Sequence, residues 1–163
     1  MKVAVPLNRF QTRLASLSDL PAICAIEDSS FSTPYPPSLL EQLLQECSQS
    51  FFVATSGAGK LLGYCVSSLR GKSAHLISVA VHNNFRRKGV ATSLLRRAIE
   101  SVTASSVDEF WLEVKKNNLE AIGLYLKFGF KNTGVLKAYY SDGSDAVRMH
   151  LVLRALNHAR RHG

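Results

Sequence analysis

A basic, glycine-containing turn is the feature that most constrains how this chain of 163 residues can fold. The run Arg86-Arg87-Lys88-Gly89-Val90-Ala91 lies between a strand-like segment, 74–81, and a segment with helical periodicity, 91–105. A strand that leads through such a turn into a helix predicts an anion site, because the first N–H groups of a helix have no intrahelical partner. Glycine at position 89 lets the backbone approach an anion closely. Taken alone, a turn of this kind more often indicates only a basic, solvated helix start.

Composition narrows the class of protein. The formal net charge is +8, which favours an anionic partner such as nucleic acid, a ribosomal surface or a phosphate-bearing cofactor, although a basic surface without such a role is an alternative. The absence of an 18-residue apolar run predicts no membrane association, and the first twenty residues do not resemble a signal peptide. Three widely spaced cysteines, Cys24, Cys47 and Cys65, predict a reduced, cytoplasmic protein with no metal site.

The periodicity predicts a mixed α/β chain that forms one domain over residues 1–163, with a core at about 12–153 and a basic C-terminal tail at 154–163. Helices are expected near 18–30, with Ser18 as the N-cap, and at 38–47, 91–105 and 119–128. Strands are expected at 51–55, 61–69, 74–81, 110–114, 130–135 and 146–153. The first two of these strands are joined by the turn 57–60 and so predict a hairpin.

Two further motifs accompany the basic turn. The first is Trp111-Leu112-Glu113-Val114, and the second runs from Asn118 through Ala121, Leu124 and Tyr125 to Gly129-Phe130. Together with the turn, which follows the strand Val79-Ala80-Val81, they resemble the signatures of the GCN5-related N-acetyltransferases. The match is closest to the RimI-type, ribosomal-protein-alanine acetyltransferases and related N-terminal acetyltransferases, which also have a Tyr-Tyr pair like Tyr139-Tyr140.

The resemblance implies a mostly antiparallel central sheet flanked by helices, with a splayed pair of strands that binds CoA. It implies acetyl-CoA as co-substrate, no metal, and a protein or peptide N-terminus as acceptor, for example that of a ribosomal protein. The implied cofactor contacts are Val79, Ala80, Val81, Arg86, Arg87, Lys88, Gly89, Val90, Ala91, Thr92 and Asn118. Asn118 is also a plausible helix N-cap.

Two residues carry the implied chemistry. By the resemblance, Glu113 would take a proton from the attacking amine through water. Strand alternation places its side chain on the side opposite Leu112 and Val114. Tyr125 would protonate the leaving thiolate. An α-amine, with a pKa of about 8, is roughly one-tenth neutral at pH 7, so an N-terminal acceptor needs only a modest base. His75 is assigned a structural role.

The resemblance leaves the acceptor contacts and some alternatives open. Phe31, Tyr35, Tyr139 and Tyr140 are candidates for the walls of the acceptor site, or they serve only in packing. Acetylation of lysine or small amines is the nearest alternative, and a basic RNA- or ribosome-binding module is an alternative of another class. The sequence lacks the alternation of aromatic and basic residues that is typical of an RNA-reading sheet. Nucleic acid is therefore not required for the predicted activity.

Overall fold

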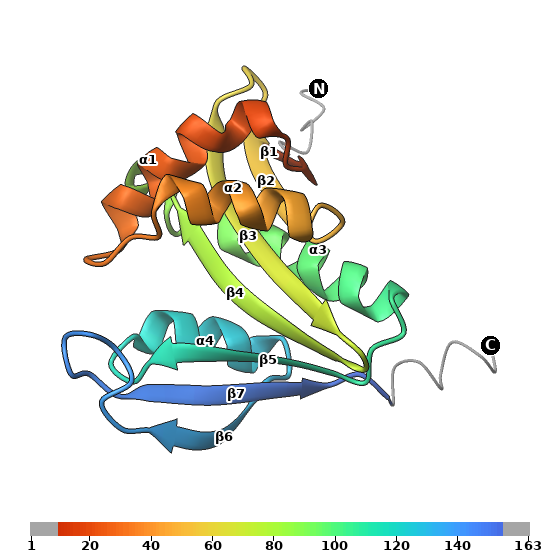
Figure 1. Ribbon diagram of the computed structural model, residues 1–163, viewed down its shortest axis with the longest axis vertical. Helices are drawn as coiled ribbons and strands as arrows, with labels where there is room; N and C mark the ends of the chain where they lie inside the picture. The colour runs from red at the N-terminus through yellow and green to blue at the C-terminus, as the bar shows by residue number, and fades with distance from the viewer. Residues whose placement is uncertain (1–9, 155–163) are drawn as a thin grey trace, which may run out of the picture.

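The computed structural model describes residues 10–154, and one sheet holds the strands of this part in the order β1-β2-β3-β4-β5-β7-β6 (Figure 1). The strands are β1 (Phe10–Leu14), β2 (Phe51–Ser56), β3 (Leu61–Arg70), β4 (Ser73–Val81), β5 (Glu109–Lys115), β6 (Lys131–Leu136) and β7 (Ala146–Val152). The helices are α1 (Leu20–Ser30), α2 (Pro37–Glu46), α3 (Val90–Ala104) and α4 (Leu119–Lys127), with two 3-10 turns, η1 (Leu17–Asp19) and η2 (Asn83–Phe85). Except for β4–β5, all strand pairs are antiparallel, as predicted.

Helices cover the sheet on both faces, and each face has its own apolar core. On one face α1 and α2 pack against β2, β3 and β4, where Ile23, Leu40 and Tyr64 are fully buried. On the other face α3 and α4 pack against the sheet, and Leu94 and Phe110 lie in that core. The buried residues of α3 recur at three- and four-residue intervals, which is the spacing that defines one side of a helix.

The join between β4 and β5 shapes the middle of the molecule. These parallel strands pair only at their beginnings, from Ser73↔Glu109 to His75↔Trp111. Along the rest of their length β4 stays paired with β3, and β5 stays paired with β7. The two strands therefore diverge toward their carboxyl ends, which matches the splayed pair expected from the resemblance.

One helix start differs from the prediction. Ser18 is not the N-cap; Ser16 caps η1, and Asp19 stands at the N-cap position of α1. The Asp19 carboxylate accepts hydrogen bonds from the Ser16 N–H at 2.8 Å and from the Arg13 guanidinium. This pair of contacts fixes the start of the helical segment two residues earlier than the sequence pattern predicts.

The ends of the chain limit two expectations. Residues 1–9 and 155–163, which include Arg160 and Arg161 of the predicted basic tail, lie outside the described residues. The division of residues 1–163 into a single domain therefore stays a prediction. Between residues 10 and 154, no helix is both long enough and apolar enough to cross a membrane.

Gly63 gives a direct test of the close contact between β3 and β4. A Cβ at this position would lie 2.8 Å from the carbonyl oxygen of Ala80, a backbone atom of the paired strand. We expect Gly63→Ala to lower the free energy of unfolding by about 1–3 kcal/mol, measured by urea denaturation. Gly57→Ala, where a Cβ meets nothing within 4 Å, should change it by less than about 0.5 kcal/mol. Equal stability of the two variants would contradict this account of the packing.

Candidate active site

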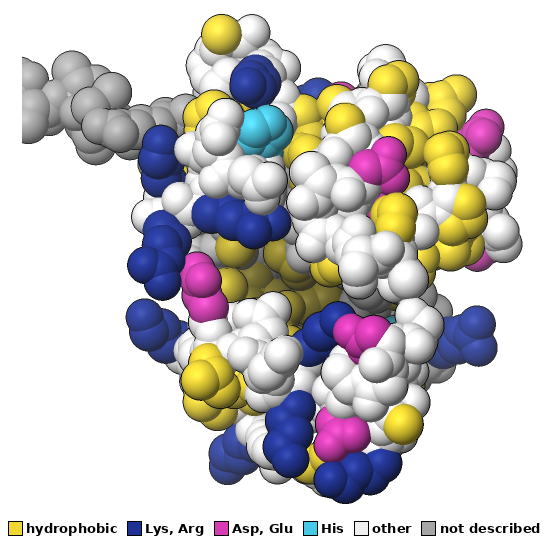
Figure 2. All heavy atoms as spheres, turned by 90° about the vertical axis from the view of Figure 1, so that its left-hand side faces the viewer, with side chains coloured by type: hydrophobic (Ala, Val, Ile, Leu, Met, Phe, Trp, Pro, Cys, Tyr) yellow, Lys and Arg dark blue, Asp and Glu magenta, His cyan; other side chains and the backbone are white. Residues whose placement is uncertain are grey.

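Two cavities lie at the divergence of β4 and β5. Their volumes are about 660 Å³ and about 520 Å³. Figure 2 shows the hollow between the two halves of the molecule, with an apolar floor and lysine and arginine side chains around its rim. The residues that line both cavities are Ser30, Phe31, Val79, Asn118, Ala121 and Tyr125. A ligand in one cavity can therefore lie against a ligand in the other.

The larger cavity contains the basic turn, and nearly all of the predicted cofactor residues line it. These are Val79, Ala80, Val81, Arg86, Arg87, Gly89, Val90, Ala91, Thr92 and Asn118. Lys88 is the exception, and its ammonium group lies 5.4 Å from the centre of the ring of Phe85, which does line this cavity. Gly89 has a φ of 85° at the N-cap of α3, a left-handed conformation that glycine adopts without strain. Val90, Ala91 and Thr92 of the first turn of α3 line this cavity, and the first N–H groups of a helix have no intrahelical partner.

The two arginines of the turn have different surroundings. The Arg86 side chain makes an internal hydrogen bond, in which its Nε donates to the carbonyl oxygen of Val81 at 3.1 Å. The side chain of Arg87 is 81% exposed and lies 3.6 Å from Glu120 of α4. Arg87 is therefore the guanidinium at the mouth of the cavity that is available to an anion, whereas Arg86 fixes the turn to the end of β4.

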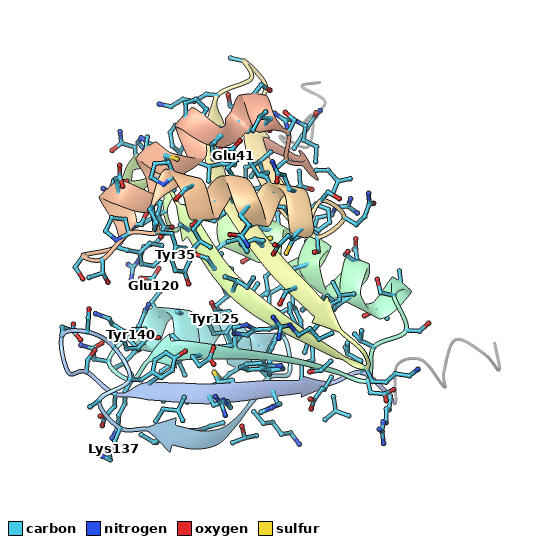
Figure 3. The ribbon with its side chains drawn as sticks, viewed as in Figure 1. Tyr35, Glu41, Glu120, Tyr125, Lys137 and Tyr140 are labelled. Atoms are coloured by element: carbon cyan, nitrogen blue, oxygen red, sulfur yellow. The ribbon has the colours of Figure 1, made fainter. Side chains whose placement is uncertain are left out.

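The smaller cavity is bounded by β4, β5 and the loop between α1 and α2. The predicted catalytic and acceptor residues that line it are Phe31, Tyr35, Glu113, Tyr125 and Tyr140. Figure 3 shows Tyr35 on one side of the gap and Tyr125 and Tyr140 on the other. Burial raises the pKa of the Tyr140 phenol to about 12, and the nearby Tyr139 and Glu113 add to this effect. Tyr139 does not line the cavity, and it packs edge-on against Tyr140 at 5.0 Å.

Glu113 is a shielded carboxylate with two basic partners. Its side chain is 9% exposed and faces away from the buried Leu112 and Val114, as strand alternation predicts. Its Oε2 lies 2.7 Å from Nε2 of His75, and its Oε1 lies 3.5 Å from the Arg148 guanidinium. An ionised carboxylate has about four acceptor positions, so these contacts leave room for a proton or a water molecule.

His75 and Glu27 were not predicted as parts of the site. His75, assigned only a structural role from the sequence, contacts Glu113 and stacks on Trp111 at 3.9 Å. Glu27 is 2% exposed, and its carboxylate accepts hydrogen bonds from the Tyr35 N–H at 2.9 Å and from the hydroxyl of the buried Tyr64. It therefore holds the loop that walls the smaller cavity. A glutamate on the buried side of a helix was the one signal in the sequence for this role.

Tyr125 occupies the junction between the cavities. It comes from α4 and packs against Phe130 with a ring-centre distance of 5.8 Å. Burial raises the pKa of its phenol above the ordinary value, so the hydroxyl keeps its proton at neutral pH. Asn118, at the start of the same helix, accepts a hydrogen bond from the Ala121 N–H through its Oδ1, and is thus an N-cap that also lines both cavities.

Comparison with known proteins fits this fold and site. Residues 20–130 match the model of the acetyltransferase (GNAT) family, and the chain belongs to that family. It is 37% identical over 153 residues to an N-alpha-acetyltransferase of Sulfolobus acidocaldarius, which covers 86% of this chain and 90% of the relative. It is 29% identical over 137 residues to the ribosomal protein bS18-alanine N-acetyltransferase of Escherichia coli, which covers 82% and 91%.

Solved structures agree with the family assignment. Ard1 from Thermoplasma volcanium superposes with a TM-score of 0.84 at 32% identity, and the match covers 89% of this chain and 98% of that one. The fold also matches a chain of the NatC complex bound to Gag peptide and CoA, with a TM-score of 0.84 at 22% identity and coverage of 89% and 99%. The predicted family and fold are therefore confirmed, whereas the roles of individual residues stay predictions.

Arg87 provides a test of the anion site. We expect Arg87→Glu to weaken the binding of CoA by about tenfold, because a carboxylate would replace the exposed guanidinium beside the N-terminus of α3. Isothermal titration calorimetry with CoA measures this change. Arg70→Glu, at the far end of β3, is the matched charge reversal and should leave the affinity unchanged. Equal weakening by both variants would mean that general charge, rather than a local contact, holds the ligand.

Proposed function

We propose that this protein transfers the acetyl group of acetyl-CoA to the α-amine at the N-terminus of a protein. The observation that carries this proposal is the shared wall of the two cavities, which includes Tyr125. A thioester in the larger cavity would meet an amine in the smaller one. The names of the two relatives, both N-terminal or alanine N-acetyltransferases, support the same reaction.

The larger cavity fits a ligand with a diphosphate group. Gly89 brings the backbone close to the cavity, and the first turn of α3 offers N–H groups and the positive end of the helix dipole. Arg87 would add a guanidinium at the mouth, and the exposed edge of β4 at Val79 would receive the less polar part of the ligand. Acetyl-CoA, when bound, supplies the acyl group as a thioester.

Glu113 would act as the base. The acceptor amine attacks the thioester carbonyl, a C–N bond forms, and the amine must lose one proton. Glu113 would receive this proton through a water molecule, at an acceptor position left free by His75 and Arg148. The modest strength of a carboxylate is sufficient, since about a tenth of an α-amine is already neutral at pH 7.

Tyr125 would act as the acid. As the C–S bond breaks, the sulfur of the leaving group takes up negative charge and needs a proton or a hydrogen bond. The Tyr125 phenol lines both cavities and carries its proton at neutral pH, since the ordinary pKa of a phenol is about 10 and burial raises it further. The transfer then balances: one proton passes from the amine to Glu113, and one passes from Tyr125 to the sulfur.

The acceptor would be a protein N-terminus in the cytoplasm, for example that of a ribosomal protein. The smaller cavity is walled by Phe31, Tyr35 and Tyr140, which can surround the first residues of a chain. Acetylation of lysine side chains is the nearest alternative. A lysine amine, with a pKa of about 10.4, is almost fully protonated at pH 7, so a much smaller fraction of it than of an α-amine is neutral and able to attack.

Substitution of the proposed acid and base tests the mechanism. We expect Glu113→Gln and Tyr125→Phe each to lower kcat by about a hundredfold, because each removes one proton transfer. Affinity for acetyl-CoA should stay nearly unchanged, as measured by calorimetry. Glu109→Gln is the matched control, since Glu109 lies on the same strand and the same face but outside both cavities. Wild-type turnover in both variants would rule out these two roles.

The choice of acceptor is tested with two peptides that have the same sequence and one internal lysine. One has a free α-amine, and the other is blocked at its N-terminus. Mass spectrometry after incubation with acetyl-CoA should show one added acetyl group, at the N-terminus of the free peptide alone. Preferential modification of the lysine would contradict the proposal and favour the lysine-acetylating alternative. Salt-dependent binding to RNA with no acetyl transfer to either peptide would favour the RNA-binding module.

A further inference from the structure

One face of β5, β7 and β6 carries no helix within the described part of the chain (Figure 1). The alternate residues of these strands, such as Phe110, Leu112 and Met149, point into the core beside α3 and α4. Five residues, which we call the open face, lie on the other side: His75, Trp111, Lys131, Arg148 and His150. None of them belongs to either apolar core.

The open face is a preformed row of rings. The strand register places His75, Trp111, His150 and Lys131 next to one another across four strands. The rings of His75 and Trp111 stack at 3.9 Å, those of Trp111 and His150 at 6.4 Å, and His150 is also held by Thr133 at 2.6 Å. Side chains that are fixed before binding lose little conformational entropy when a ligand arrives.

The charge on the open face is mainly positive toward solvent. Lys131 is exposed, and the Arg148 side chain is 39% exposed over the Trp111 ring. The nearest carboxylate, Glu113, is 9% exposed and already has His75 and Arg148 as partners. Glu109 lies farther along β5 and accepts a hydrogen bond from Ser73. An acidic segment is therefore the complementary ligand.

The open face begins where the smaller cavity ends. Glu113 lines that cavity and also contacts two members of the open face, His75 and Arg148. Lys131 lies two strands farther on, on β6, and paired strands are about 4.8 Å apart. Lys131 is also level with Trp111, two residues along the strand from Glu113, so an extended peptide that advances about 3.4 Å per residue needs roughly three to four residues to span the distance. A peptide with its amine near Glu113 would reach Lys131 at about its fourth to sixth residue.

We propose that the open face binds the part of the acceptor chain that follows its first residues, and that it favours aspartate and glutamate at positions four to six. This inference rests on the proposed function, because it places the acceptor amine in the smaller cavity. The two cavities alone would not select acceptors at these positions. The open face would select them by the charge of acceptor residues that take no part in the reaction.

Three peptides and three proteins test this docking. The peptides share their first three residues: a tripeptide amide, a heptapeptide with glutamate at positions four to six, and a heptapeptide with lysine there. The proteins are the wild type, Lys131→Glu, and Arg96→Glu, an equal charge reversal at an exposed position on α3 across the sheet. The measurement is kcat/KM for each pair at low and at high salt.

We expect the wild type to prefer the glutamate peptide to the lysine peptide by roughly fivefold, which is the scale of two exposed ion pairs. Lys131→Glu should abolish or reverse this preference, and Arg96→Glu should keep it. All three proteins should acetylate the tripeptide alike, and the wild-type preference should shrink in high salt because surface charges are screened.

The outcomes separate the two proposals. Acetylation of the tripeptide without discrimination between the heptapeptides would overturn the docking face and leave the proposed function intact. An equal loss of preference in Lys131→Glu and Arg96→Glu would also overturn it, because the selection would then come from overall charge. Failure to acetylate any of the peptides would overturn both proposals.

Discussion

The short parallel contact between β4 and β5 is the constraint on which the rest of the structure depends. Three residue pairs join the strands, and beyond His75↔Trp111 each strand follows its other neighbour. Sheets twist, so two strands that are held by different partners separate steadily. Both cavities lie in this separation. A longer ladder between β4 and β5 would place backbone where the proposed thioester and amine must meet.

Polar contacts link the two halves of the molecule and support the walls of the cavities. His75 on β4 is the last residue that pairs with β5, and its side chain contacts Glu113, which lies two residues beyond its partner Trp111. Glu27 links α1 to β3 through Tyr64, and the same carboxylate holds the loop at Tyr35. A buried carboxylate is costly to leave without hydrogen bonds, and these contacts satisfy it. The sheet and its cores hold Glu113 and Tyr125, whereas the basic turn and the acceptor-wall candidates Phe31, Tyr35 and Tyr140 lie in loops.

Much of the fold could be predicted from local patterns. The apolar spacing of α3 and the alternation around Glu113 both appear in the structure as predicted. The basic turn and the two motifs together predicted the family, which the match over residues 20–130 confirms. The error at the first helix has a local physical cause: the Asp19 carboxylate accepts hydrogen bonds from the Ser16 N–H and from Arg13, so the cap is Ser16 and not Ser18. Catalysis by Glu113 and Tyr125 is still a prediction.

The sequence by itself determined the helices and strands, the glycine turn at the start of α3 and the family, because periodicity, capping and turn geometry depend on residues close together in the chain. Only the tertiary structure decided which side chains meet. His75 and Glu113 are 38 positions apart, and Glu27 and Tyr64 are 37 apart. Their contacts depend on strand order and register, which are set by the packing of the whole sheet and leave no mark on any single segment.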